Sequence, residues 1–73
     1  MKILVGSIMK VDLIKDSLLN MEEVKLTYEG KNGLNMVFSC ESDNEKATLR
    51  KVKDYLKTIP KLGGVFYNVF IGY

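Results

Sequence analysis

The sequence predicts an α+β sandwich in which four antiparallel strands and two helices follow one another in the order βαββαβ. Three observations predict it. Apolar and polar residues alternate along the segments on either side of Asn32-Gly33, which is the pattern of half-buried strands. Apolar residues recur with helical spacing in residues 43–59, which indicates an amphipathic helix. Both ends of the chain are dense in β-branched and aromatic residues, which favour strands.

The length of 73 residues predicts one domain, residues 1–73, because so short a chain buries only about 60% of its unfolded surface and cannot form two cores. Hydrophobic residues make up 47% and charged residues 27%, which is typical of a soluble globular protein. No apolar run approaches the roughly 18 residues of a membrane-spanning helix, and no signal peptide is evident. We expect a cytoplasmic protein with no membrane contact.

The chain has one cysteine, Cys40, and no histidine. A single cysteine cannot form an intramolecular disulfide, and no cluster with zinc-ligand spacing is possible, so we expect no metal and no cofactor. This cysteine usage fits a reducing compartment. Cys40 alternates in phase with Met36 and Phe38, and we therefore expect a buried packing residue rather than a reactive thiol.

Residues 23–41 predict a β-hairpin with two inward-facing sets of residues. The sets are Val24, Leu26 and Tyr28 in its first strand and Met36, Phe38 and Cys40 in its second. A two-residue turn at Asn32-Gly33 would send these sets to opposite faces of the sheet. A three-residue loop, residues 31–33, keeps them on one face, with Gly33 in the left-handed conformation of a bulged turn. The expected pairs are Tyr28 with Met36, Leu26 with Phe38, and Val24 with Cys40.

Residues 43–59 predict the second helix. Its apolar stripe is Leu49, Val52, Leu56 and Ile59, with Tyr55 beside it. Ser42, followed three residues later by Glu45, is a capping-box pattern that predicts the start of this helix. Pro60 predicts its end, because proline cannot continue a helix.

Residues 2–9 predict the first strand and residues 65–73 the last. Between the first strand and the hairpin we expect a short helix without convincing caps. Its helically spaced apolar residues are Val11, Ile14, Leu18 and Met21. This order of elements gives a ferredoxin-like domain, a four-stranded antiparallel sheet with two helices on one face.

The first and last strands are predicted to be apolar on both sides, whereas the hairpin strands are mostly polar on the face away from the helices, with Val37 the exception. A monomer would expose either Phe66 and Phe70 or the alternate set with Tyr67 and Tyr73. We therefore expect a homodimer or higher oligomer formed through the sheet. Alternatively, a loop, the chain end or a twisted edge hides the aromatics. The predicted oligomer or ligand surface is Leu4, Ile8, Phe66, Tyr67 and Phe70.

The second helix carries a basic stripe, whose members recur at i, i+4, i+7 and i+11 within one arc of its exposed side. They are Lys46, Arg50, Lys53 and Lys57. One interpretation is a solvated face that keeps the chain soluble. The other is an RNA- or anion-binding module whose binding depends on salt. The net charge of +2 is too small to decide between them, and the stripe lacks interleaved aromatics.

The sequence offers little for catalysis, since it has no histidine, nucleophile motif or phosphate-binding loop, and no carboxylate pair that its spacing would bring together in a pocket. We expect solvated acids at Glu22 and Glu23. Gly6-Ser7 could bring backbone close to a ligand or simply form a bend in a short strand. The sequence therefore predicts no enzyme.

Residues 52–65, VKDYLKTIPKLGGV, resemble the helix, turn and last strand of ACT-type regulatory domains, in which a helix ends in an Ile-Pro-Gly-Val-like turn. The resemblance covers the second half of the chain. Ser7 to Val11 stand where that family has a Pro-Gly turn. The resemblance implies paired domains that bind amino acids or other small effectors at the interface. The resulting hypothesis is a non-catalytic, self-associating domain that binds a small ligand or a protein partner.

Overall fold

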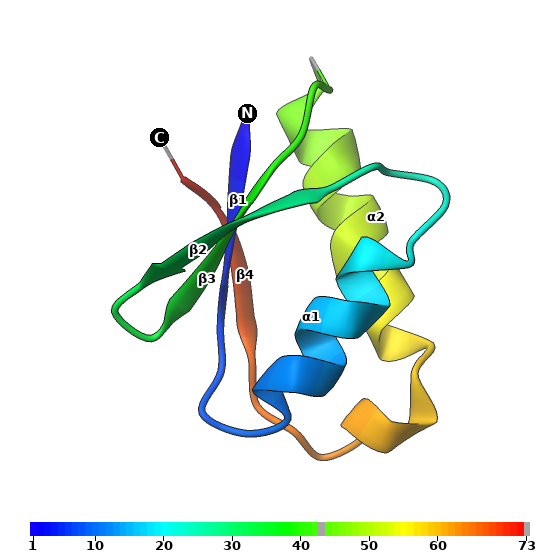
Figure 1. The fold of residues 1–73 in the computed structure, drawn as a ribbon. Coiled ribbons are helices and arrows are strands. Elements are labelled where there is room, and N and C mark those ends of the chain that lie inside the picture. The colour runs from blue at the N-terminus through cyan, green and yellow to red at the C-terminus, as the bar shows by residue number, and fades with distance from the viewer. Residues whose placement is uncertain (43, 73) are drawn as a thin grey trace.

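The computed structural model describes residues 1–42 and 44–72, which form the elements in the predicted order (Figure 1). The strands are β1 (Lys2–Gly6), β2 (Thr27–Asn32), β3 (Asn35–Ser39) and β4 (Asn68–Gly72). The helices are α1 (Val11–Leu19) and α2 (Glu45–Lys57), and a 3-10 turn, η1 (Pro60–Leu62), precedes β4. All strand pairs are antiparallel, in the order β2-β3-β1-β4. The predicted ferredoxin-like α+β fold, with both helices on one face of the sheet, is confirmed.

The core lies between the two helices and the inner face of the sheet. Its largest fully buried side chains are Ile3, Val5, Ile14, Leu18, Met36, Phe38, Val52 and Leu56. Each side chain of this kind stabilises the fold by about 1.5–3 kcal/mol relative to an exposed one. Both predicted inward sets of the hairpin face this core, and the ring of Tyr28 lies 5.4 Å from that of Phe38. Cys40 is buried and has no disulfide partner, as predicted.

The predicted hairpin register is wrong, although the predicted faces are right. β2 and β3 are joined by a two-residue turn at Gly33 and Leu34, and Tyr28 pairs with Phe38, two residues from its expected partner. A bulge between Tyr28 and Gly30 adds one residue to β2 and restores the parity that a two-residue turn alone would break. Gly30 has φ 119° and Gly33 has φ 66°, conformations that glycine adopts without the steric cost of a side chain.

The N-cap of the second helix lies two residues later than the predicted one. Its N-cap is Asn44, whose Oδ1 accepts a hydrogen bond of 3.0 Å from the N–H of Ala47. Ser42 instead accepts a hydrogen bond of 2.6 Å from the hydroxyl of Thr48. The prediction of Ser42 as the cap is therefore wrong, because asparagine satisfies the same helix N–H groups from a position closer to the helix. Asp43, the first residue of the predicted helix, lies outside the described residues.

The remaining helix ends follow local backbone rules. Lys10 precedes α1 with φ 56° and makes no side-chain cap, in agreement with the expected lack of a cap. α2 ends at Lys57, two residues earlier than predicted. Ile59 has the extended backbone values φ −90° and ψ 110°, because a residue that precedes proline, here Pro60, is pushed out of the helical region.

The first and last strands are shorter than predicted. β1 ends at Gly6, so Ile8 lies beyond the strand and does not belong to its second face. β4 begins at Asn68, so Phe66 precedes it. The prediction of two-sided apolar strands therefore holds only for their central part. Tyr73, predicted as the last strand residue, lies outside the described residues.

Candidate functional site

Three apolar side chains form a row across the face of the sheet that the helices leave open. Leu4 pairs with Val37 on one side and with Phe70 on the other, and residues paired in this way point to the same face. Phe70 is 39% exposed and the other two are half-buried. The side chain of Leu4 lies over Gly72, where there is no side chain to displace it. We call Val37, Leu4 and Phe70 the open-face row. It contains two of the five predicted surface residues.

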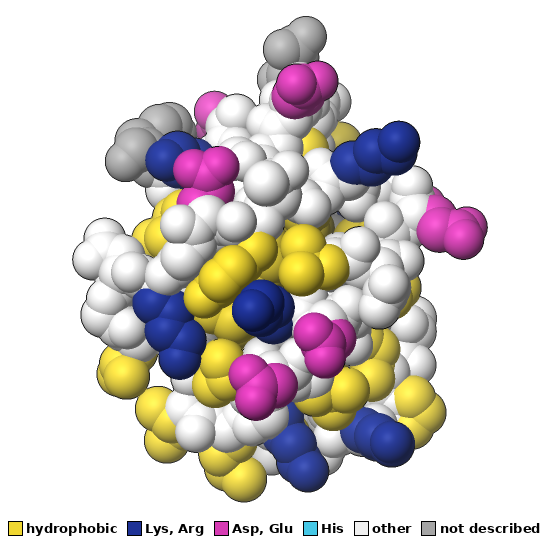
Figure 2. All heavy atoms as spheres, viewed as in Figure 1, with side chains coloured by type: hydrophobic (Ala, Val, Ile, Leu, Met, Phe, Trp, Pro, Cys, Tyr) yellow, Lys and Arg dark blue, Asp and Glu magenta, His cyan; other side chains and the backbone are white. Residues whose placement is uncertain are grey.

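A second apolar group, the sheet-end cluster, consists of Ile8, Leu34 and Phe66. These side chains are 79%, 71% and 91% exposed, and together they line a shallow hollow of about 400 Å³. In Figure 2 several hydrophobic side chains protrude along the lower edge of the molecule, where the end of β1 and the start of β4 lie in Figure 1. The structure thus brings the predicted residues Ile8 and Phe66 together, beyond the ends of the strands.

Tyr67, the fifth predicted surface residue, also lines this hollow but is less accessible than Ile8 and Phe66. It is half-buried and packs against the core, whereas its neighbour Phe66 is 91% exposed. Of the two sets of aromatics predicted for the last strand, Phe66 and Phe70 are exposed and Tyr67 is half-buried, while Tyr73 lies outside the described residues.

Polar groups connect the open-face row with the sheet-end cluster. A second row across the sheet consists of Asn35, Gly6 and Asn68, and the amide of Asn35 lies over Gly6. The hydroxyl of Ser7 lies 3.2 Å from the carbonyl oxygen of Phe66 and 2.7 Å from that of Met9, and can donate to either. These contacts hold the turn after β1 against the segment before β4, and so fix the cluster in place.

The opposite corner of the open face is polar, as the sequence predicts for the hairpin strands. Glu29 accepts a hydrogen bond of 3.0 Å from the hydroxyl of Ser39 and lies 3.6 Å from the ammonium of Lys2. The side chains of Lys2 and Glu29 are 50% and 39% exposed, and ion pairs this accessible contribute at most about 1 kcal/mol. This corner marks one edge of the apolar surface.

All four members of the basic stripe, Lys46, Arg50, Lys53 and Lys57, are exposed, but their surroundings differ. Arg50 lies 3.9 Å from Asp54 on the same helix. Lys53 and Lys57 line a groove of about 380 Å³ together with residues 65–69, which include Phe66 and Tyr67. The fold therefore places aromatic side chains beside the stripe, although none occurs within the stripe itself.

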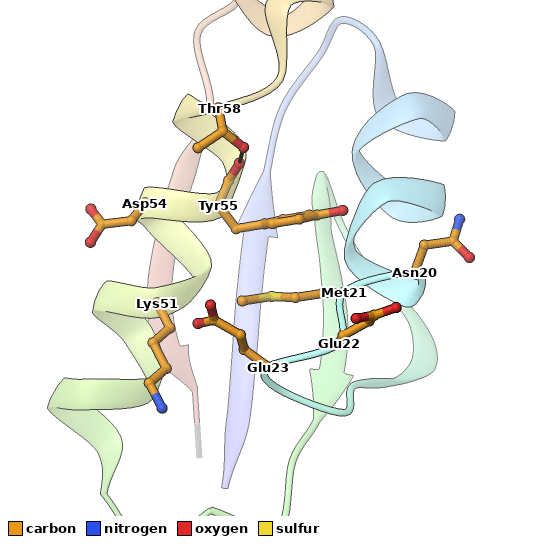
Figure 3. A pocket seen from close by; sticks show the side chains of 8 residues that line it. All are labelled: Asn20, Met21, Glu22, Glu23, Lys51, Asp54, Tyr55 and Thr58. Carbon is orange, nitrogen blue, oxygen red and sulfur yellow. Dashed lines mark hydrogen bonds between the residues drawn. The ribbon is translucent and has the colours of Figure 1, made fainter.

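A cleft of about 580 Å³ lies on the other side of α2, facing the end of α1. Figure 3 shows the ring of Tyr55 reaching across it above Met21, with Glu22 and Glu23 approaching from the loop after α1. Lys51 and Asp54 border the cleft on α2, and Asp54 points away from it. Glu22 and Glu23 are exposed, as expected for solvated acids.

Within residues 1–42 and 44–72, no group of three or more histidine, cysteine or acidic side chains is arranged to hold a metal ion. Over the same residues, no helix is both long and apolar enough to cross a membrane.

The sequence analysis did not identify Leu34 as a member of the sheet-end cluster, and it did not identify Val37 as a member of the open-face row. Leu34 was not predicted to belong to this surface. Its position directly after the turn glycine Gly33 could have indicated its exposure, because an apolar residue in a turn does not lie on the buried face of a strand. Val37 was noted only as an exception on a polar strand, and its role in the open-face row becomes visible only from its pairing with Leu4.

Comparison of the chain with protein-family models, curated proteins and solved structures gives no significant match.

Proposed function

We propose that this chain is a non-catalytic domain that associates with a second copy of itself through the open-face row and the sheet-end cluster, and that binds a small ligand or a protein partner at this surface. The observation that carries the proposal is that two exposed apolar groups lie near one another, on the open face and at the end of the sheet, with only one short polar row between them. Soluble monomers rarely expose so many large apolar side chains in one region.

The open-face row has the shape that a second copy would match. Leu4 lies at its centre, with the small Val37 on one side and the large Phe70 on the other. A two-fold axis that passes Leu4 parallel to the strands brings Val37 of one copy against Phe70 of the other. The two ends of the row are thus complementary in size, which is what a symmetric interface requires.

The size of the domain also supports a second copy as the molecule that covers the open face. A stable dimer buries about 800 Å² on each partner. This area is about a sixth of the total accessible surface of 4974 Å², so one side of the domain is large enough to form the interface. A net charge of +2 opposes the approach of two copies only weakly. Small domains also gain most from additional burial between copies.

The hollow at the sheet end is where we place a small ligand or a segment of a partner. Its apolar wall is the sheet-end cluster, and the amides of Asn35 and Asn68 line it beside Ser7. An apolar wall with a few fixed polar groups is typical of ligand sites. The resemblance of residues 52–65 to ACT-type domains, which hold effectors at the interface of paired domains, agrees with this position. A reducing, cytoplasmic compartment suits the unpaired Cys40.

Sedimentation equilibrium tests the self-association. Measured from about 1 μM to about 1 mM protein, a range that spans binding free energies of about 8 to 4 kcal/mol, the average mass should rise from that of a monomer towards twice that value. The double variant Ile8→Ser and Leu34→Ser should weaken association by about tenfold or more, because each large apolar side chain contributes about 1.5–3 kcal/mol when buried.

Leu19→Ser is the matched control, since Leu19 is 42% exposed at the end of α1, away from the sheet. It should leave the association unchanged. A monomer mass throughout the concentration range, or equal weakening by the control, would overturn the proposed self-association.

A further inference from the structure

The outer edge of β4 is open and lies beside two cations. β4 is the last strand in the sheet order and pairs only with β1 in the described chain. An edge strand presents unpaired backbone N–H and C=O groups that can accept another strand. Lys53 and Lys57 of α2 line the groove along this edge with residues 65–69. The groove therefore combines free backbone groups with positive charge.

Among the described residues, the two lysines of this groove have no acidic partner. Neither forms an ion pair with a described residue, in contrast to Arg50 on the same stripe. No acidic side chain of the described chain lines the groove, whose other walls are Val65, Phe66 and Tyr67 with the first residues of β4. An occupant that supplies carboxylates would complement this charge.

The charge also argues against a second copy at this edge. If two β4 strands paired antiparallel, edge to edge, α2 of each copy would lie on the same side of the joined sheet. Lys53 and Lys57 of one copy would then face the same residues of the other, and like charges brought together in this way repel. The open edge of β4 is therefore a different surface from the open-face row that the proposed function assigns to self-association.

We propose that the groove between α2 and the edge of β4 binds an extended acidic peptide segment of a partner protein. The peptide adds to the sheet as a fifth strand and places its carboxylates against Lys53 and Lys57. Backbone hydrogen bonds to β4 supply affinity, and the lysines supply selectivity for acidic sequences.

The spacing of the two lysines specifies the peptide. Residues four apart on a helix are separated by about 6 Å along its axis, and alternate residues of a strand lie about 6.6 Å apart on one face. Acidic residues at alternate positions of the peptide therefore match Lys53 and Lys57. The intervening residues point to the open face beside Phe70, which is 39% exposed, and are expected to be apolar.

The test uses a fluorescently labelled synthetic peptide, Ser-Glu-Val-Glu-Val-Glu-Ser, and a control peptide of the same composition in which the three glutamates are adjacent. Fluorescence anisotropy should show saturable binding of the alternating peptide that weakens as salt is raised, since exposed charges are screened. Amide exchange in residues 68–72 should slow on binding, because the edge N–H groups become hydrogen-bonded. The double variant Lys53→Gln and Lys57→Gln should lower the affinity by about five- to tenfold, since exposed ion pairs are weak individually.

The matched control is Lys51→Gln with Lys61→Gln, which removes the same charge from exposed positions outside the groove and should leave the affinity nearly unchanged. Equal losses in both double variants, equal binding of the two peptides, or tighter binding of a single-stranded oligonucleotide than of the alternating peptide would overturn the proposal. None of these variants alters the open-face row or the sheet-end cluster, so the outcome is separate from that of the self-association test.

Discussion

The inner and open faces of the sheet are made by neighbouring residues of the same strands, yet solvent reaches them very differently. In β1, Ile3 and Val5 are 0% exposed, whereas Leu4 between them is only half-buried. Phe38 on the inner face is 0% exposed, and Phe70 on the open face is 39% exposed. Two helices can cover only one face of the sheet. One face therefore supplies the core, and the other retains apolar surface that another molecule can bury.

The largest expected difference between the two surfaces is in their contribution to stability. Phe38→Ala should lower the free energy of unfolding by about 3–5 kcal/mol, because it leaves a cavity in the core. Phe66→Ala should change it by no more than about 0.5 kcal/mol, since exposed side chains contribute little. Urea denaturation followed by circular dichroism, at a concentration where the chain is monomeric, measures both. Similar losses for the two variants would show that the sheet end belongs to the core.

An intermediate effect is expected at the bulge that aligns the two faces in β2. Gly30 has φ 119°, so Gly30→Ala should lower the free energy of unfolding by about 1–3 kcal/mol through backbone strain. Gly63→Ala is the control, since Gly63 has φ −61° and its added Cβ would meet a single atom at 3.3 Å. The same denaturation measurement compares them. A neutral Gly30→Ala variant would contradict the role of the bulge in setting the register.

The smallest effect is expected at the polar corner of the open face. Glu29→Gln weakens the contact with Lys2, which is 50% exposed in its side chain, and should change the free energy of unfolding by at most about 0.5 kcal/mol. Asp54→Asn, which weakens the contact with Arg50, is a matched change on α2. Thermal denaturation at low and high salt compares the two. A loss above about 1 kcal/mol at Glu29 alone would mean that the open face is as important for folding as the inner face.

Alternation and helical spacing were sufficient to predict the fold and the inner face, because burial on one side leaves a periodic pattern in the sequence. Met36 and Phe38 were assigned to the correct face, and Val24 and Leu26 were correctly predicted to be buried, although they precede β2 rather than lying in it. The register of the hairpin could not be predicted in the same way, since a bulge at Gly30 moves the pairing by two residues without changing which side chains face inward.

The candidate surface could be predicted only in part. Leu4 and Phe70 were found because they alternate with buried residues. Ile8 and Phe66 were found as well, but were placed inside strands that end before them. Leu34 was missed, because its exposure depends on a turn whose position follows from the bulge. The groove at β4 could not be anticipated, since it joins residues of α2 and β4 that only the tertiary structure brings together.

Whether a second copy covers the open face can be tested by an isotope-filtered NMR experiment on an equal mixture of labelled and unlabelled chain at high concentration. We predict intermolecular contacts from the methyl groups of Leu4 and Val37 to the ring of Phe70, with further contacts from Ile8 and Leu34. Intermolecular contacts confined to α2 or to the edge of β4, or none at all, would contradict it.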